Sequence, residues 1–565
     1  MRGGPEDAAR LARARTPGLQ TPPPAPSLHA PSPHAASLHS PASPPLSSLH
    51  APPDRRLVIA LMGLVFLADV LMRPYVPPFE SRYLSVAWEM HLHHNWFVPT
   101  DNGLPYSHKP PLLFWLMNLV WLPGVSETAA RLICPAIALV GLWLTGRLGD
   151  RIGGRRVGDG AVTILAGIAP FFFYAGRTAF DGMLMVATIL VAMALWRIAH
   201  PEDTGGRATA GTPPAAARRE LWPWIGLGCA LGLGIYSKGP VILLLVAPIW
   251  LGMRLWAGAG HFSWRGLGAA LAVALALLAL WLVPALAGAG PAFREELLWG
   301  QSAGRVVNSF AHKRPFWHYL EILPLLLFPW ILVVDFWRRR AFDRAERFLW
   351  LWAAGGLALL SLISAKQAHY ALPLMPAVAL LAARRWPERL RRPLGPVIGL
   401  AGLFAGLVAI ALGASGADMA ALVPVWILPL LAVPLLAAGV AMWRAPRLGF
   451  LAVPALGVAL ALGYALGPAG EIMSLDGLGR RMAPFDGRLA VTERLTASHF
   501  IFAGRLKHPI TVALSPEAIA AFADAGPEGR IVAPLAASVR PDWPPVETLR
   551  YGTDGPYGIW STKRP

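Results

Sequence analysis

The residues from Glu80 to Trp115 combine acidic, basic, aromatic and apolar side chains in one short stretch, directly after the first long apolar segment of the chain. The acid Glu80 stands two residues before Arg82, and Lys109 follows near the end of the stretch. A carboxylate can accept a proton from an attacking hydroxyl group, and Lys and Arg side chains bind phosphate. Aromatic and Leu-rich runs beside these residues suit a membrane surface. The stretch therefore indicates a site for a substrate that is partly lipid and partly polar.

Further polar groups follow at the ends of later apolar segments. Asp181 stands at the start of one segment, and Lys238 stands in the turn after another. Ionisable residues at such positions are costly unless they face water, a partner or a ligand. The other members of this set are Tyr106, Ser107, His108, His312, Lys313, Arg314, Lys366, His369 and Tyr370. Carboxylates and several cations in one set of connections predict a site for a phosphate-bearing substrate and a hydroxyl nucleophile.

The composition is that of a membrane protein. Of the 565 residues, 55% are hydrophobic and only 15% are charged, and the mean hydropathy is +0.48, whereas soluble proteins carry roughly 25% charged residues. Apolar runs of roughly 17–25 residues, the length of a membrane-spanning helix, recur along the chain. Cys134 and Cys229 both lie inside apolar runs, which predicts small buried side chains and no disulfide framework. The sequence thus predicts an all-α polytopic membrane protein.

We expect about thirteen transmembrane helices from these apolar runs. They lie at 57–73, 128–146, 159–175, 181–198, 222–237, 239–257, 266–287, 318–336, 347–364, 369–383, 394–414, 421–442 and 447–467. If the N-terminus is cytoplasmic, the even-numbered connections should be basic. They are, for example in the connections with Arg147, Arg151, Arg155 and Arg156, and with Arg338, Arg339, Arg340, Arg344 and Arg347. The odd-numbered connections, which carry the polar groups above, are then expected on the non-cytoplasmic face of the membrane.

The net charge of +18 comes mostly from these short arginine-rich connections. Charge placed in this way orients a membrane protein. No basic stripe with interleaved aromatic residues lies outside the connections, as it would in a nucleic-acid-binding protein. We therefore expect membrane lipid as a partner and no nucleic acid.

We expect three regions along the chain. Residues 1–54 form a tail rich in Pro, Ala, Ser and His, which cannot bury enough apolar surface to fold. Residues 55–470 form the transmembrane catalytic domain, in which 74–127 is the first extracytoplasmic loop. In residues 471–565, short strand-like runs alternate with the helix-like segment 515–525. This alternation predicts a small extracytoplasmic α/β domain.

The order of residues in the first loop resembles that of a known family. It reads E-x-R-Y, A-x-E-M, N-W-x-x-P and G-L-P-Y-x-x-K-P-P-L-L-x-W within residues 80–115. This order resembles the first extracytoplasmic loop of the membrane-embedded glycosyltransferases of the GT-C class. The similarity is greatest to the lipid A aminoarabinose transferases and the related bacterial protein-mannosyltransferase-like enzymes. Further matches follow at Asp181, 238–240, 312–317, 328–330 and 366–373, so that the resemblance covers roughly residues 57–385.

The resemblance implies a GT-C type transmembrane domain and an inverting glycosyltransferase. Such enzymes transfer a sugar from a polyprenyl-phosphate-linked donor to an acceptor at the outer face of the inner membrane. The acceptor would be a lipid A-like lipid or another extracytoplasmic lipid or protein. Lys109 and Tyr370 match the family's positions for binding the donor phosphate. The additional candidate phosphate ligands are Arg82, Lys313, Arg314 and Lys366. An acceptor hydroxyl would need a base, whereas a phosphate acceptor is already ionised.

One departure from the family pattern affects the catalytic acid. The family begins its first motif with an acidic pair, D-E-x-R-Y, whereas this chain has Phe79 before Glu80. Three alternatives follow: Glu80 has taken the catalytic role, Asp181 does the work, or the protein has drifted from the ancestral reaction. Asp69, near the end of the first span, is a further acidic candidate.

Histidines introduce a second departure. His108, directly before Lys109, stands where the family often has glutamate. Together with His312 it could bind a divalent metal ion, since imidazole suits zinc-like ions. Alternatively, both histidines hydrogen-bond within their loops or to phosphate.

The rival hypothesis is a transporter or flippase of lipid-linked glycans. Transporters usually contain internal repeats and helices that are interrupted near the middle of the membrane. The predicted spans contain no internal repeat, and the polar residues gather at one face. Both observations favour an enzyme.

Overall fold

The computed structural model describes residues 51–75, 79–201, 213–258, 261–300, 313–333, 336, 342–386, 427–551 and 556–563. The chain divides into two compact units, Met1–Pro45 and Leu46–Pro565, and all described residues lie in the second unit. Three sequence predictions fall outside the described residues: nearly all of the 1–54 tail, the span at 394–414, and the metal candidate His312.

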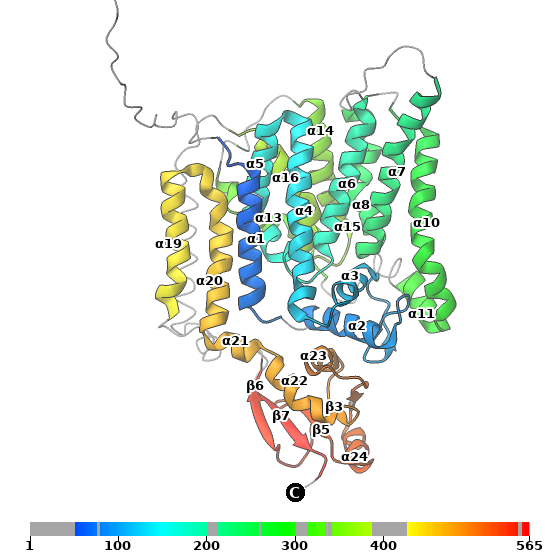
Figure 1. The fold of residues 1–565 in the computed structure, drawn as a ribbon, viewed down its shortest axis with the longest axis vertical. Coiled ribbons are helices and arrows are strands. Elements are labelled where there is room, and N and C mark those ends of the chain that lie inside the picture. Colours follow the sequence, from blue (N-terminus) through cyan, green and yellow to red (C-terminus); the bar gives the residue numbers. More distant parts are fainter. Residues whose placement is uncertain are drawn as a thin grey trace, which may run out of the picture. The chain divides into compact units, whose positions relative to one another are not determined.

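Helices of the first half of the chain, most of them long, pack side by side (Figure 1). They are α1 (Arg55–Met72), α4 (Glu127–Gly153), α5 (Arg155–Ala166), the π-helix η2 (Phe171–Ala175), α6 (Asp181–Ala199) and α7 (Pro213–Lys238). The Asp54 carboxylate caps α1 by accepting a hydrogen bond from the Arg56 backbone N–H at 2.7 Å. Ser126 caps α4 in the same way, and α4 ends at Gly154, whose φ of 79° favours glycine. These local signals explain why α1 and α4 begin close to the predicted spans at 57–73 and 128–146, whereas α4 continues seven residues beyond its predicted end.

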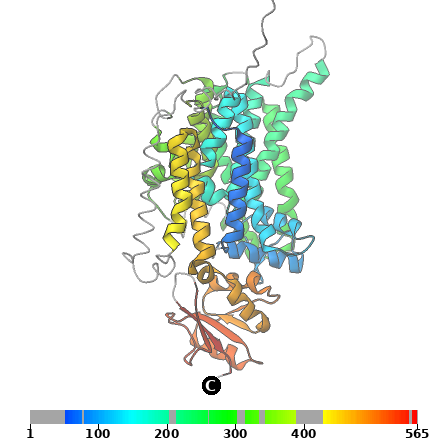
Figure 2. The same ribbon diagram turned by 60° about the vertical axis from the view of Figure 1, so that its left-hand side comes forward.

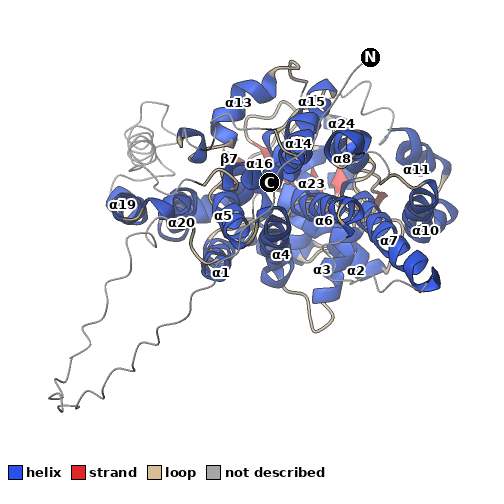
Figure 3. Cartoon of the chain, turned by 90° about the horizontal axis from the view of Figure 1, so that it is seen from above, coloured by secondary structure: helices blue, strands red, loops and turns tan. Residues whose placement is uncertain are grey.

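Most of the following helices are short, and several are interrupted. They are α8 (Val241–Leu251), α9 (Met253–Trp256), α10 (Trp264–Gly288), α11 (Pro291–Glu295), η4 (Glu296–Gly300), α13 (His318–Leu326), η5 (Trp330–Leu332), α14 (Arg344–Trp350), η7 (Leu351–Gly355), α15 (Gly356–Leu362), η8 (Ala368–Leu374), α16 (Met375–Ala383), α19 (Leu428–Arg444), η10 (Pro446–Leu451) and α20 (Ala452–Leu466). Seen along the helices, α6, α7 and α8 lie together around one part of the bundle (Figure 3). On another side, α20 contacts both α19 and α1 (Figure 2, yellow beside dark blue).

Four of the described helical segments are long and apolar enough to cross a membrane: α4, α6, α10 and Arg447–Leu466. Shorter apolar segments are Val241–Trp256, Ala368–Ala383 and Leu428–Arg444. Large apolar side chains on α10, such as Leu275 and Leu280, are exposed, as they are on a lipid-facing surface. The protein is therefore a helical membrane protein. The count of about thirteen spans stays a prediction, because several expected spans are broken, as 239–257 is at Gly252 between α8 and α9.

The first loop folds into two helices and a hairpin. Its elements are α2 (Phe79–His93), β1 (Thr100–Asp101), β2 (Leu104–Pro105) and α3 (Leu112–Val120). The hairpin turns at Asn102 and Gly103, whose φ angles of 54° and 75° suit a two-residue turn that favours this residue pair. The Glu89 carboxylate of α2 accepts hydrogen bonds from both turn N–H groups, at 2.6 and 3.0 Å. Helix α2 thereby fixes the hairpin that leads the chain towards Lys109.

The C-terminal residues form a mixed five-stranded sheet with helices. The elements are α21 (Pro468–Met473), α22 (Asp476–Met482), η11 (Ala483–Phe485), β3 (Leu489–Val491), α23 (Arg494–Gly504), β4 (Thr511–Val512), α24 (Pro516–Asp524), β5 (Arg530–Pro534), β6 (Glu547–Arg550) and β7 (Pro556–Ser561). The strand order is β4-β3-β5-β7-β6; β3 is parallel to β4 and β5, and β7 is antiparallel to β5 and β6. Ala490, Ile531 and Trp560 are buried in the core of this sheet.

The first loop and the C-terminal residues are joined by direct contacts. Helix α2 packs against α23, where the Ser85 hydroxyl donates a hydrogen bond to the Ser498 carbonyl at 2.7 Å. Asn102 forms two hydrogen bonds with the backbone of Ile510: its Nδ2 donates to the carbonyl at 2.8 Å, and its Oδ1 accepts from the N–H at 2.7 Å. The hairpin is therefore held from both sides, by α2 and by the C-terminal residues.

Replacing Gly103 with alanine should loosen this attachment. The added Cβ atom would lie 2.8 Å from Cγ of Pro509, and the φ of 75° disfavours other residues. Gly154→Ala is the matched control, because Gly154 has a similar φ of 79° but no heavy atom within 4 Å of the added Cβ. We expect only the Gly103 variant to release the C-terminal residues faster in limited proteolysis, with an extra destabilisation of about 1–2 kcal/mol. Equal proteolysis rates for the two variants would contradict this account.

Candidate active site

Asp181 is buried where two helices meet. It is the first residue of α6, and Lys238, the last residue of α7, places its Nζ atom 2.6 Å from Asp181 Oδ1. Helices α6 and α7 pack against each other, so the ion pair forms at the same end of both helices. The sequence analysis placed Lys238 in the polar set without a partner, and the structure places it in direct contact with a candidate acid.

The segment η8 brings two further residues to the same carboxylate. His369 Nε2 lies 3.8 Å from Asp181 Oδ2, the oxygen that does not bind Lys238. Lys238 Nζ lies 4.1 Å from the centre of the Tyr370 ring, a cation–π contact. The Thr188 hydroxyl of α6 donates a hydrogen bond to the Pro373 carbonyl at 3.2 Å, which holds η8 against α6.

Lys109 completes what we call the Asp181 cluster: Asp181, Lys238, His369, Tyr370 and Lys109. The Lys109 ammonium lies 5.9 Å from the centre of the Phe180 ring, and its charge acts on Asp181. Three basic side chains thus stand around one carboxylate, and the cluster carries surplus positive charge. Such an arrangement favours an anionic ligand, and phosphate is the anion that Lys side chains commonly bind. Of the predicted site residues, the structure brings together Asp181, Lys109 and Tyr370.

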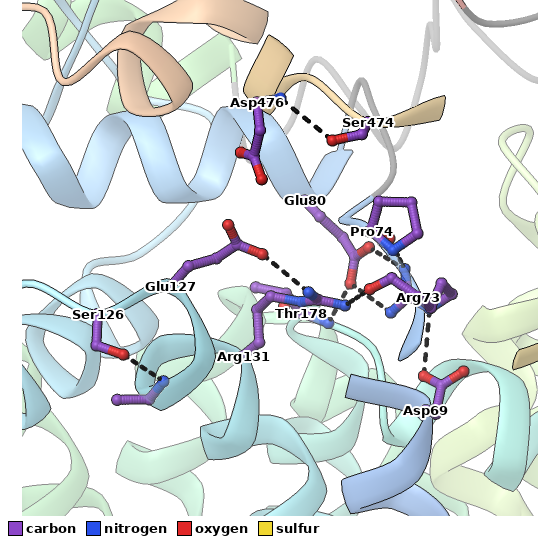
Figure 4. A network of polar contacts seen from close by, with 11 residues as sticks. Asp69, Arg73, Pro74, Glu80, Ser126, Glu127, Arg131, Thr178, Ser474 and Asp476 are labelled. Carbon is purple, nitrogen blue, oxygen red and sulfur yellow. Dashed lines mark hydrogen bonds and ion pairs between the residues drawn. The ribbon is translucent and has the colours of Figure 1, made fainter. Parts of the chain in front are cut away.

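Glu80 belongs to a separate buried ion-pair network (Figure 4). Its carboxylate binds Arg73 Nη1 at 2.7 Å and accepts a hydrogen bond from the Thr178 N–H at 3.2 Å. Arg73, whose side chain is only 1% exposed, also pairs with Asp69 at 3.2 Å, and its carbonyl accepts a hydrogen bond from Arg131. Burial alone would raise the pKa of Glu80, but the charge and hydrogen bond of Arg73, together with the charges of Arg177 and Arg131, outweigh it and lower that pKa to about 2. A carboxylate held in this way is a weak base, so the catalytic role of Glu80 stays a prediction.

Acid should destabilise the protein through Glu80. Its pKa is about 2 in the folded chain against an ordinary value of 4.5, so the ionised form is favoured by folding. This contribution is complete above pH 4.5 and is lost as the pH falls towards 2, at a cost of about 3 kcal/mol. The measurement is the apparent Tm of the detergent-solubilised protein from pH 6 down to about 3. A Glu80→Gln variant should have a lower Tm at neutral pH and a shallower acid dependence; identical slopes would exclude Glu80 as the cause.

Arg82 lies beside Asp101 of the hairpin, which in turn binds the C-terminal residues. Its Nε lies 3.8 Å from Asp101 Oδ2, and the Ser498 hydroxyl donates to the same carboxylate at 2.8 Å. The pKa of Asp101 is raised, because the effect of burial exceeds the lowering by the Ser498 hydrogen bond and the Arg82 charge. These contacts give Arg82 a place in the junction between the hairpin and α23. Its role as a phosphate ligand stays a prediction.

Lys313, Arg314 and Lys366 tie two connections together. Lys313 forms a β-bridge with Ala365, and the Arg314 N–H donates to the Ser364 carbonyl at 3.2 Å. The Lys366 ammonium donates hydrogen bonds to main-chain carbonyls, including that of Arg314 at 3.1 Å. Lys366 is thus placed as a structural clamp just before η8, and the phosphate-binding roles predicted for these three residues are untested.

The metal prediction gains no support from the described residues. His108 packs beside the Tyr106 ring at 5.2 Å between ring centres, and its proposed partner His312 lies outside the described part of the chain. Within the described ranges, no group of three or more His, Cys, Asp or Glu side chains could hold a metal ion. A divalent ion at His108 and His312 stays a prediction.

Comparisons with known proteins agree with this architecture. No protein-family model matches the chain. An undecaprenyl phosphate-alpha-4-amino-4-deoxy-L-arabinose arabinosyl transferase of Edwardsiella ictaluri is 30% identical over 378 residues, which cover 64% of each chain. Its Pseudomonas aeruginosa counterpart is 28% identical over 372 residues, covering 63% of this chain and 64% of that enzyme. The crystal structure of ArnT from Cupriavidus metallidurans bound to undecaprenyl phosphate has a TM-score of 0.68 at 20% identity, covering 90% of this chain and 97% of ArnT. The crystal structure of the same ArnT in the apo state has a TM-score of 0.70.

The chain is a relative of these transferases and has the GT-C fold. The resemblance predicted from the first loop is therefore confirmed. The sequence match spans 64% of the length of the Edwardsiella relative, slightly less than two thirds, whereas the fold match extends over 90% of the chain.

Sequence reasoning missed Arg73 and Arg177. Arg73 follows Asp69 by four residues at the end of a helix, a spacing that forms ion pairs and could have indicated it. Arg177 stands four residues before Asp181 and is partly buried, and its charge acts on Glu80. Burial and the neighbouring Arg73 lower the pKa of Arg177. No sequence pattern predicts that the charge of Arg177 would act on Glu80 and Asp69.

Proposed function

We propose that the chain is an inverting glycosyltransferase that takes a sugar from a polyprenyl-phosphate-linked donor. The observation that supports this most is the Asp181 cluster, in which basic residues from three separate segments surround one buried carboxylate. The Edwardsiella and Pseudomonas relatives are named for an undecaprenyl-phosphate-linked aminoarabinose donor, and the Cupriavidus ArnT structure contains undecaprenyl phosphate. A polyprenyl phosphate has the charge that the cluster favours and a tail suited to a helical membrane protein.

The cluster suits the chemistry of the leaving phosphate. As the bond between the sugar C1 atom and the phosphate oxygen breaks, the electron pair stays on the phosphate, which gains a second negative charge. Lys109 and Lys238 can stabilise this charge as it develops, which is the usual source of most of the rate enhancement in such reactions. The acceptor oxygen attacks C1 from the opposite face, so the configuration inverts. Asp181, through its ion pair, holds the Lys238 ammonium over the Tyr370 ring.

The acceptor we propose is a lipid A-like lipid or another extracytoplasmic molecule. A phosphate group on lipid A would attack without a base, because it is already ionised. A hydroxyl acceptor would need a base, and Asp181 is better placed than Glu80 for that role. Glu80 is fixed by Arg73 in a separate network, whereas Asp181 lies among the cluster's cations.

The proposal includes a location and a division of labour. We propose that the cluster faces the periplasm from the bacterial inner membrane, that about thirteen helices span it, and that residues 471–565 lie outside the membrane. The arginine-rich connections at the opposite ends of the helices support this orientation. The contacts of α23 with α2 support a role for the C-terminal residues in holding the first loop.

A reconstituted assay tests the proposal directly. The purified chain in lipid nanodiscs is incubated with undecaprenyl-phosphate-linked aminoarabinose and lipid A, and the products are followed by mass spectrometry. We expect glycosylated lipid A and free undecaprenyl phosphate, with an Asp181→Asn variant at least about 10²-fold slower, because the Lys238 ammonium loses the ion pair that holds it near the leaving phosphate. Full activity of a folded Glu80→Gln variant would remove Glu80 from the mechanism, and an effect of EDTA would revive the metal prediction.

The same purified chain can be tested for the rival function, transport of the lipid-linked sugar. In vesicles with the labelled donor lipid in one leaflet, a flippase would move the lipid to the other leaflet without forming a glycosidic product. Transport without transfer, across several candidate acceptors, would replace the glycosyltransferase proposal.

A further inference from the structure

The cation whose charge depends on pH in the Asp181 cluster is His369. Its Nε2 atom faces Asp181 Oδ2 at 3.8 Å, while Asp181 Oδ1 is bound by Lys238 at 2.6 Å. The His369 side chain is 25% exposed, so it is reachable from solvent or from a ligand. A histidine changes its charge between about pH 5 and 8, unlike the two lysines beside it.

The surroundings of His369 include groups that favour and groups that oppose its protonated form. Asp181 attracts the imidazolium, whereas Lys238 and the more distant Lys109 repel it. The aromatic neighbours are Tyr174 of η2, with ring centres 5.4 Å apart, and the adjacent Tyr370 at 4.7 Å. With His369 neutral, Asp181 and the two lysines carry one net positive charge together. Protonation adds a second positive charge at the point where Tyr370 and Lys109 are proposed to bind phosphate.

We propose that His369 is a proton-dependent phosphate-binding residue of this site. The inference rests on the proposed function, and it adds a residue to the proposed phosphate ligands. The donor is a phosphodiester with a single negative charge, and the departing polyprenyl phosphate is a monoester with up to two. The imidazolium of His369 supplies the additional positive charge that matches the charge gained when the C1–O bond breaks. No proton needs to move in this step, because the electron pair stays on the phosphate oxygen.

The orientation of His369 favours this role over that of a general base. Its Nε2 atom faces Asp181, so a proton on Nε2 is stabilised by the carboxylate. A base would act on the acceptor, and its loss would leave the pH dependence of donor-phosphate binding unchanged.

Undecaprenyl phosphate binding measured against pH tests the proposal. The probe is undecaprenyl phosphate itself, titrated into the full chain in detergent between pH 5.5 and 8 and followed by tryptophan fluorescence. The His369→Gln variant should bind about as tightly as the wild type at pH 8 and about 10-fold more weakly at pH 5.5. The ligand's own ionisation affects both proteins alike, so the ratio of their Kd values isolates His369. The matched control is His318→Gln, because His318 lies 3.4 Å from Glu321 on α13 and outside the cluster.

Each outcome separates this inference from the proposed function. A Kd ratio that stays constant over the pH range, whether equal to one or not, would overturn the role of His369 and leave the proposed function standing. Absence of binding to the wild-type chain at every pH would overturn the proposed function as well. If His369→Gln does not fold, His369→Lys gives the opposite signature: binding tighter than that of the wild type at pH 8 and similar at pH 5.5. A Kd of that variant equal to the wild-type Kd at both pH values would contradict the proposal.

Discussion

Replacing Lys109 with alanine should lower the rate of sugar transfer about 10²–10³-fold while the protein stays folded. Lys109 lies beside Phe180, and its charge reaches Asp181. Its ammonium stabilises the phosphate most when the second negative charge develops, so kcat should fall more than the affinity for the donor. The measurement is the steady-state rate of undecaprenyl phosphate release with undecaprenyl-phosphate-linked aminoarabinose as donor.

Two variants make this result specific. Lys507→Ala removes an exposed lysine of the C-terminal residues and should leave kcat and KM unchanged. Lys109→Arg keeps the charge and should recover part of the rate, since the guanidinium binds phosphate with a different geometry. An unchanged kcat/KM in Lys109→Ala would remove this residue from the site and weaken the proposed function.

The Arg73→Met variant should lose about 3–5 kcal/mol of stability, the largest loss expected for a single substitution in this chain. Arg73 is almost completely buried and pairs with both Glu80 and Asp69. Without its guanidinium, two carboxylates would be left in a buried environment with less compensation. The expected readout is a drop in apparent Tm in detergent and reduced recovery of folded protein.

An exposed ion pair of the same type provides the control. Arg155 pairs with Asp54 at 2.7 Å, but its side chain is 67% exposed, so Arg155→Met should cost less than about 1 kcal/mol. Combining Arg73→Met with Glu80→Leu should restore part of the stability, because the uncompensated carboxylate is removed along with its partner. Similar Tm losses for the Arg73 and Arg155 variants would show that the Glu80 network is not structurally important.

Local sequence signals predicted much of the fold. The apolar run at 128–146 lies inside α4, whose start and end are fixed by Ser126 and Gly154, residues that act within a few positions of themselves. Likewise, strand β5 lies in the run RIVAPL and helix α24 in the segment 515–525. Such features depend on short-range geometry, so a single sequence is enough to place them.

The partners of the site residues could not be predicted in the same way. Asp181 binds Lys238 across 57 positions, and it faces His369 from a still more distant segment. Glu80, which the sequence analysis proposed as a catalytic acid, forms an ion pair with Arg73. Arg73 stands seven residues earlier, between α1 and α2. Arg82 pairs with Asp101, whose carboxylate also accepts a hydrogen bond from the Ser498 hydroxyl. These pairings depend on how helices pack, and periodicity contains no information about which ends will meet.

The double hydrogen bond between Asn102 and Ile510 also constrains how the protein is made. The two residues are 408 positions apart, so a ribosome has nearly finished the chain before Ile510 exists to receive the hairpin. Until Ile510 has been synthesised, the hairpin is held only by its contacts with α2 and neighbouring residues, and the surface that later binds Ile510 is uncovered. Nascent chains stalled before this point should therefore display a protease-sensitive hairpin that full-length translation conceals.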